Sequence, residues 1–449
     1  MTPGALDSLD SLKSLVLAQA EQIGLLREQN AALAKRVAEL EAKLNSPPKT
    51  PSNSSLPPSK EQKANCPEAP AEKKARHGRP GVARQLAETP DHVRHVYAER
   101  CDSCGKRAKP GDQPSVAAYD HIDLPPIKPV VTRVNLHSGT CACCGKRIAA
   151  RPPADMPVGS PFGPGIVSVV TYLHACQMVS YSRLTEVLDG LLGVKLSQGA
   201  IANMLARAAK PFAASAARIA DTVRNSPVIA SDETSARVCG KTHWQWTFAA
   251  ASAVYHMIVP TRGKVVPTEF LAGIRPKVWI SDRLAAQGNH AEAHQVCLAH
   301  LIRDAQYAID AGDTVFAPAF KRFLQRACAI ARRRPELADA TIKRHARDLE
   351  RDLDRLLDLE PTNTAGNHLR ASMVVDAREK LLVFMTRRDV EPTNNVSERA
   401  LRPSVIFRKV TNGFRSGWGA KVYADIASIV ATGRLHGRTP LANIRAALA

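Results

Sequence analysis

The stretch from Pro392 to Pro403 reads PTNNVSERALRP, and the rest of this 449-residue chain is organised around it. It places one carboxylate, Glu398, early in a predicted helix, among amides and arginines. Asn395 and Glu398 also have the spacing of a capping box, in which Asn395 bonds the free N–H groups of the helix and Glu398 reaches back. This stretch alone therefore leaves open both a helix start and a functional carboxylate.

Two further carboxylates follow predicted strands. The apolar run 227–231 stops at Asp232, and the run 277–281 stops at Asp282. An alternating segment over 244–248 and a run over 253–259 complete four predicted strands. Ligand sites of α/β sheets lie beyond the carboxyl ends of strands, so the two aspartates are expected to face one another. The alternative is that each acid only ends its strand in a turn.

Two strand-end aspartates and one helix-borne glutamate form a ligand set for hard divalent cations. Asp232, Asp282 and Glu398 offer the oxygen ligands that Mg²⁺ or Mn²⁺ prefers, and a pair of such ions supports in-line displacement at a phosphodiester. The attacking group is then a water or a 3′-hydroxyl. No protein nucleophile is required.

Composition indicates a polyanionic partner. Lys and Arg number 62 against 42 Asp and Glu, which gives a net charge of +20 and a pI near 9.7. Nucleic acid fits this surplus best, although a basic surface kept for solubility is the alternative. The chain shows no apolar run of about 18 residues and no signal-peptide pattern, so we expect a cytoplasmic, nucleoid-associated protein without a membrane partner.

Residues 1–45 are predicted to form a coiled coil. Apolar residues recur with heptad spacing, which favours a parallel homodimer with Asn30 in the seam, and a single amphipathic helix is the alternative. The two core positions are occupied by Leu9, Val16, Ile23, Asn30, Val37 and Leu44, and by Leu12, Gln19, Leu26, Leu33 and Leu40. Residues 46–97, with eight prolines over 46–80, are predicted to be a disordered basic linker.

Residues 98–155 carry a duplicated Cys-containing element. Four thiolates in two CxxC pairs suit a tetrahedral Zn²⁺ site, and a Gly-Lys follows each pair. The predicted ligands are Cys101, Cys104, Cys141 and Cys144. Cys143 is a competing ligand, and a redox pair is the alternative.

The remaining segments are predicted from periodicity. Residues 156–225 read as a helical, helix-turn-helix-like DNA-binding region, although any two packed helices give the same pattern. Residues over about 317–388 again read as helical and strongly charged, and 441–449 as a C-terminal tail. Cations interleaved with aromatic residues after Glu398 predict a groove for DNA. The predicted DNA contacts are Arg399, Arg402, Arg408, Lys409 and Arg415.

The chain resembles the DDE transposases of bacterial insertion sequences, specifically the insertion-sequence-66 family. The resemblance rests on Asp232-Glu-Thr, Ser281-Asp282, the segment from Cys297 to Arg303 that contains CLAH, and the long motif around Glu398. It implies a ribonuclease-H-like catalytic domain over 226–440, with a helical insertion over about 317–388 and with Asp232, Asp282 and Glu398 as its metal-binding triad. Cys297 and His300, three residues apart, either bind metal or pack; packing is favoured because two ligands make an incomplete zinc site.

The sequence thus predicts a multidomain α+β protein that cleaves DNA and transfers its strands. Two rivals belong to other functional classes. One is a non-catalytic DNA-binding regulator, which the N-terminal third alone would explain. The other is a ribonuclease-H-like nuclease that hydrolyses DNA without strand transfer.

Overall fold

The computed structural model describes residues 16–17, 19–34, 36–37, 47–54 and 84–449. Its contacts divide the chain into two units, one built from residues 1–62, 152–184 and 197–449 and the other from 63–151 and 185–196. The described part of the predicted coiled coil is helical, whereas Leu9, Leu12, Leu40 and Leu44 lie outside the described residues. Most of the predicted basic linker, over 55–83, also lies outside them. The described chain is mixed α+β, as predicted.

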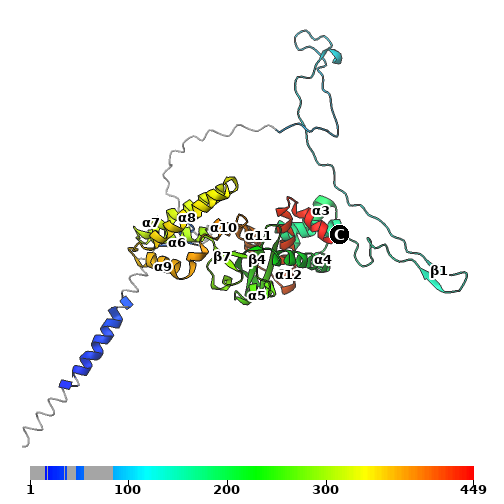
Figure 1. Cartoon of the computed structure of the whole chain (residues 1–449). Helices are drawn as coiled ribbons and strands as arrows, with labels where there is room; N and C mark the ends of the chain where they lie inside the picture. Colours follow the sequence, from blue (N-terminus) through cyan, green and yellow to red (C-terminus); the bar gives the residue numbers. More distant parts are fainter. Residues whose placement is uncertain (1–15, 18, 35, 38–46, 55–83) are drawn as a thin grey trace, which may run out of the picture. The chain divides into compact units, whose positions relative to one another are not determined.

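A five-stranded mixed sheet forms the frame of the larger unit (Figure 1). Its strand order is β5-β4-β3-β6-β7, with β3, β4 and β5 antiparallel and with β6 and β7 parallel to β3. The strands are β3 (Val228–Val238), β4 (Lys241–Ala249), β5 (Val254–Val259), β6 (Val278–Ser281) and β7 (Ala293–Val296). All four predicted strands are present, and β7 is an additional one.

The prediction that the first strand stops at Asp232 is wrong, because β3 continues to Val238. The second half of β3 stays paired with β4 throughout: Ser235 lies opposite Trp244, and Val238 lies opposite Lys241. Cys239 and Gly240 close this hairpin with φ values of 50° and 74°. Left-handed conformations at both central residues are typical of a two-residue hairpin turn. Asp232 therefore lies within a strand, while Asp282 does follow the end of β6.

Apolar side chains of the central strands point to both faces of the sheet. In β6, Val278 and Ile280 belong to one buried cluster and Trp279 belongs to another. Side chains alternate along a strand, so a strand that is apolar at successive positions must be covered on both faces. The Trp279 face is covered by α5 (Val265–Leu271) and the end of α4 (Gln198–Arg224).

The opposite face, defined by Val278 and Ile280, carries α6 (Leu298–Asp310) and α11 (Asn395–Thr411). Its apolar cluster extends into a group of helices that follows α6 in the chain and is drawn in yellow and orange in Figure 1. These helices are α7 (Phe316–Arg333), α8 (Asp339–Leu357), α9 (Thr364–Ser372) and α10 (Val383–Thr386). They occupy the region where the sequence predicts a helical insertion.

Helix α12 (Gly417–Leu435) covers the edge strand β5 and satisfies part of its backbone. Ser428 Oγ accepts the His256 N–H at 2.8 Å, and Thr432 Oγ1 accepts the Val254 N–H at 3.0 Å. Covering an edge in this way keeps its unpaired N–H groups from recruiting another strand. Helix α12 thus packs on the sheet at its β5 edge.

Helices α2 (Pro164–Thr171), α4 and α13 (Pro440–Leu448) pack with α12 in a third cluster, in which Ile444 is fully buried. Ser197 caps the start of α4, since its Oγ accepts the Ala200 N–H at 3.1 Å. Gly193, with a φ of 62°, follows the preceding helix α3 (Tyr181–Leu192). A role of these helices in reading DNA stays a prediction.

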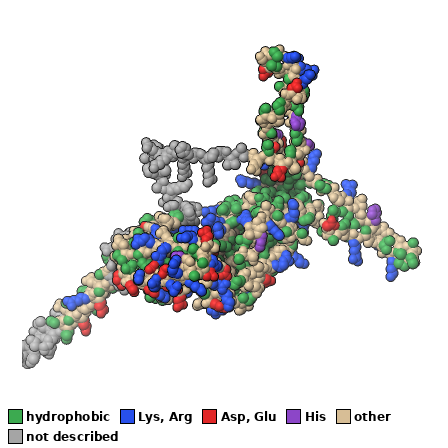
Figure 2. All heavy atoms as spheres, turned by 45° about the horizontal axis from the view of Figure 1, so that its top comes forward, with side chains coloured by type: hydrophobic (Ala, Val, Ile, Leu, Met, Phe, Trp, Pro, Cys, Tyr) green, Lys and Arg blue, Asp and Glu red, His purple; other side chains and the backbone are tan. Residues whose placement is uncertain are grey.

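The smaller unit contains the two Cys-containing loops, the short 3₁₀ helix η2 (Pro110–Asp112) and the hairpin of β1 (Ser138–Thr140) and β2 (Arg147–Ala149). Figure 2 shows Lys and Arg side chains distributed over the visible face of the larger unit. Across the described residues, no helix combines the length and apolar character needed to cross a membrane.

Candidate active site

The pleat of the sheet brings the predicted carboxylates to one face. Ala230 of β3 pairs with Ile280 of β6, and both belong to the cluster beneath α6 and α11. Two residues further along each chain stand Asp232 and Asp282, and alternation returns their side chains to that same face. Parallel pairing places equivalent positions side by side, so the two aspartates are neighbours.

The pKa of Asp232 reflects burial and the other acids around it. Burial raises the pKa of Asp232 well above its usual value, and the charges of Glu233, Asp282 and Glu398 raise it further. The Glu233 N–H, which donates to Asp232 Oδ1 at 2.9 Å, acts in the opposite direction. Several carboxylates confined in a partly buried space repel one another unless a proton or a cation compensates them.

A short turn fixes the second aspartate. Asp282 Oδ1 accepts the Leu284 N–H at 3.0 Å, the local bond by which an Asp organises the loop after it. The Asp282 side chain is partly exposed. One carboxylate oxygen is thus engaged by the backbone, and Oδ2 is the atom best placed to bind a ligand.

Glu398 lies on α11. The hydrogen bonds at the start of this helix differ from those of the capping box that the sequence suggests. The helix begins at Asn395, and no side chain caps it. Asn394 is 1% exposed, and its Nδ2 donates to the Ser231 carbonyl at 2.7 Å while its Oδ1 accepts the Ser397 hydroxyl. The alternative of a capping box between Asn395 and Glu398 is therefore not found; Asn394 instead uses its side-chain amide to attach α11 to β3 beside Asp232.

Two basic side chains of α6 face Glu398. His300 Nδ1 and Arg303 Nη2 each lie 3.8 Å from Glu398 Oε1. This exceeds a hydrogen-bond distance, and both Glu398 Oε1 and His300 Nδ1 are buried without a hydrogen-bond partner. Burial lowers the pKa of His300, with Arg303 contributing in the same direction. The Glu398 side chain is thus held in place by α11, but its buried Oε1 has no hydrogen-bond partner.

The opposite face of β3 carries a supporting network. Glu233 is almost fully buried, and its Oε1 accepts bonds from Arg262 Nε at 3.0 Å and Nη2 at 2.7 Å. Its Oε2 accepts a bond from Gln287 Nε2 at 2.7 Å, and Gln287 Oε1 accepts the indole N–H of Trp279 at 3.0 Å. This network joins β3 to the loop after Asp282. The sequence showed Glu233 only as the middle letter of an Asp-Glu-Thr triplet and gave no signal for Arg262 or Gln287.

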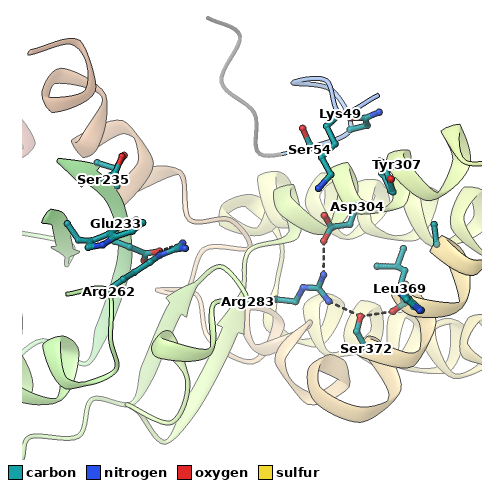
Figure 3. A pocket seen from close by; sticks show the side chains of 15 residues that line it. Lys49, Ser54, Glu233, Ser235, Arg262, Arg283, Asp304, Tyr307, Leu369 and Ser372 are labelled. Atoms are coloured by element: carbon teal, nitrogen blue, oxygen red, sulfur yellow. Dashed lines mark hydrogen bonds and ion pairs between the residues drawn. The ribbon is translucent and has the colours of Figure 1, made fainter. Parts of the chain in front are cut away.

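A cleft of about 920 Å³ lies next to these residues (Figure 3). One wall comes from β3, β4 and Arg262, and the other comes from Arg283 and the helices α6 and α9. Arg262 lies over the Trp244 ring at 4.7 Å from its centroid. Arg283 bonds Asp304 Oδ2 and the Ser372 hydroxyl, each at 2.7 Å. The cleft therefore combines cations with an aromatic face.

The predicted DNA-contacting residues lie along α11 and just after it. Arg399, Arg402, Lys409 and Arg415 are exposed. Arg408 is half-buried, and its Nη1 lies 3.4 Å from Ser235 Oγ of β3. Four of the five thus present charge at the surface close to Glu398 in the chain.

The four predicted zinc ligands form two similar loops that the structure does not bring together. In each loop the glycine N–H donates to the first cysteine carbonyl, at 2.8 Å for Gly105 and 2.9 Å for Gly145. Nearby backbone N–H groups lower the pKa of Cys101 and Cys141. Among the described residues, the only group of three or more potential metal ligands within 4.8 Å of one another is Cys297, His300 and Glu398.

Comparison with known proteins identifies the family. Residues 159–422 match the sequence model of the family described as Transposase IS66 family, which covers more than half of the chain. The chain belongs to the IS66 transposase family. No curated protein matches the chain significantly. The matched segment contains all three predicted carboxylates, and membership of this family implies a role in transposition and binding to DNA.

Proposed function

We propose that this IS66 transposase cleaves and joins DNA strands by two-metal in-line displacement, with Asp232, Asp282 and Glu398 as the ligands of Mg²⁺ or Mn²⁺. The observation that carries the proposal is the convergence of two strands and one helix on a single face, where burial and the neighbouring carboxylates raise the pKa of Asp232. The sheet order also supports the expectation of a ribonuclease-H-like catalytic domain.

The three residues fit such ions by their chemistry. Carboxylate oxygens are the ligands that hard divalent cations prefer, and the repulsion around Asp232 is what a cation relieves. Glu398 Oε1, buried and without a partner, is an available ligand atom. Bound there, the ions would activate the attacking water or 3′-hydroxyl and stabilise the leaving oxygen.

Other side chains then hold the carboxylates and the DNA. Asn394 fixes α11 against β3, and the Leu284 N–H holds the Asp282 loop. Glu233 orients Arg262 at the cleft, where a guanidinium over the Trp244 ring offers a cation and an aromatic face to a DNA strand. This arrangement positions a phosphodiester by contacts outside the reacting atoms.

The test measures nicking and joining separately on labelled duplexes that carry the DNA flanking the gene. We expect Asp232→Asn, Asp282→Asn and Glu398→Gln each to lower both rates by at least about 10²–10³-fold, the usual cost of losing one charge-stabilising group. Glu269→Gln, an exposed carboxylate of α5, is the control. Undiminished activity in all three variants would refute the triad.

The products also separate the rival functions. A nuclease without strand transfer would release nicked DNA but never a joined product. A non-catalytic regulator would bind the DNA and give neither product, with or without Mg²⁺.

We also propose that Arg399, Arg402, Arg408, Lys409 and Arg415 contact the DNA backbone. Contacts to phosphate weaken binding similarly for all sequences and contribute to its salt dependence. Replacing Arg402 with Gln should reduce the magnitude of the salt slope by about 1 and leave sequence preference unchanged. An unchanged slope would remove Arg402 from the interface.

The two Cys-containing loops are proposed to fold around one Zn²⁺. Their matching hydrogen bonds and their lowered Cys101 and Cys141 pKa values support this, since thiolates are the form that binds metal. Elemental analysis of Cys104→Ser and Cys144→Ser should show about one zinc fewer per chain than the unmodified protein. An equal zinc content would contradict the site.

The N-terminal helix is proposed to form a homodimeric coiled coil. Its described seam residues Val16, Ile23, Leu26, Leu33 and Val37 are all at least half exposed within the single chain. A partner helix would remove this apolar surface from water. Light scattering should show that Leu26→Lys converts the dimer to a monomer; an unchanged mass would refute the seam.

A further inference from the structure

Three potential metal ligands with different chemistry meet beside the proposed active site. Cys297 directly precedes α6, His300 lies in its first turn, and Glu398 faces them from α11. Their ligand atoms all lie within 4.8 Å of one another. The sequence showed Cys297 and His300 as an incomplete pair, and the tertiary structure supplies the third ligand.

Hydrogen bonding does not account for this arrangement. His300 Nδ1 and Glu398 Oε1 are both buried and unpartnered, although they face each other at 3.8 Å. Buried polar atoms without a partner are costly, and this separation is too long for a direct bond. It does match the spacing of about 3–4 Å between two ligand atoms on one tetrahedral ion.

The position of the Cys297 sulfur also suits a metal ligand. Cys297 is fully buried, and its Sγ accepts the Asn394 N–H at 3.2 Å. Burial raises the pKa of the Cys297 thiol, whereas this backbone N–H bond favours the thiolate that a metal requires, so the incoming ion itself must displace the thiol proton. His300 and Glu398 keep part of their side chains exposed, at 20% and 27%, which gives an ion a path from solvent.

We propose that Cys297 Sγ, His300 Nδ1 and Glu398 Oε1 bind one Zn²⁺ or a similar borderline cation, with water as the fourth ligand. A sulfur, nitrogen and oxygen set is typical of zinc and is unsuited to Mg²⁺. Binding transfers the Cys297 thiol proton to solvent. The consequence for catalysis rests on the proposed function. Glu398 belongs to both sites, so Zn²⁺ bound here removes Glu398 from the Mg²⁺ ligands and inhibits strand cleavage.

The test titrates the metal-stripped full chain with Co²⁺, whose thiolate charge-transfer absorption reports sulfur ligation. We expect unmodified protein to bind one more Co²⁺ per chain than Cys297→Ala. In that variant the affinity at this site should fall at least about 100-fold, since even outer-shell changes cost about 10–100-fold. Cys328→Ala, another single thiol on α7, is the matched control and should bind like the unmodified protein.

A second variant guards against a folding defect. His300→Ala should lose the same bound ion and keep the thermal unfolding transition of the metal-free protein within a few degrees. Equal Co²⁺ content and absorption in the unmodified protein and in both variants would overturn the proposal. This readout is independent of catalysis, so loss of activity in Asp232→Asn would uphold the proposed function even where the Co²⁺ result is negative.

Discussion

Asn394 provides the sharpest test of how the site is held together. Its Nδ2 donates to the Ser231 carbonyl at 2.7 Å, and its Oδ1 accepts the Ser397 hydroxyl. In Asn394→Ala, Ser397 keeps its bond to the Asn394 backbone carbonyl at 3.1 Å, so Ser231 is the acceptor left without this donor. Leaving one buried partner unsatisfied costs about 1–3 kcal/mol, and we expect the free energy of unfolding to fall by that amount.

The same substitution should also slow catalysis. Without the Asn394 side chain, α11 loses the hydrogen bond that ties its start to β3 beside Asp232, and Glu398 can shift relative to Asp232. Misplacement of a catalytic group by about 1 Å costs on the order of 10²-fold in rate. Urea denaturation measures the first effect, and nicking rates at a temperature where the variant is fully folded measure the second.

Asn395→Ala is the matched control, because Asn395 is the exposed neighbour and lies at the helix start. We expect it to change stability by no more than about 0.5 kcal/mol. If Asn395 were the cap that the sequence suggests, its loss would cost about 1 kcal/mol. A larger loss of stability in Asn395→Ala than in Asn394→Ala would refute the reasoning.

Three more predictions concern the same unit. The raised pKa of Asp232 means that the folded, metal-free protein binds the Asp232 proton more tightly than the unfolded chain does, so its stability falls as the pH rises above the pKa of Asp232 in the unfolded chain. Thermal melts should therefore show that Asp232→Asn stabilises the metal-free protein at pH 7 and removes this pH dependence of stability. Glu233→Gln should destabilise the protein by about 1–3 kcal/mol in urea denaturation, because Arg262 and Gln287 lose a charged acceptor. Buried Asn53 donates to Asp310 Oδ2 at 2.8 Å and so anchors the segment 47–54 to α6. Asn53→Ala should therefore speed proteolysis within 47–54, and an unchanged cleavage rate would contradict this anchoring role.

The sequence by itself determined the family, the mixed α+β class and most of the strands. Long motifs and apolar alternation are local properties, so they can be read without coordinates. It failed at the end of β3, where pairing with β4 continues the strand past Asp232, and at β7, whose four residues are stabilised by β6 and carry little pattern of their own.

Only the tertiary structure decided how the Glu398 stretch works. The choice between a capping box and an attachment to β3 depends on Ser231, 163 residues away in the chain from Asn394. Cys297 and His300 likewise form a candidate metal site only because the fold places Glu398 of α11 beside them. Local propensity cannot contain such contacts, because the free energy of a buried polar group depends on the partners that the fold brings to it.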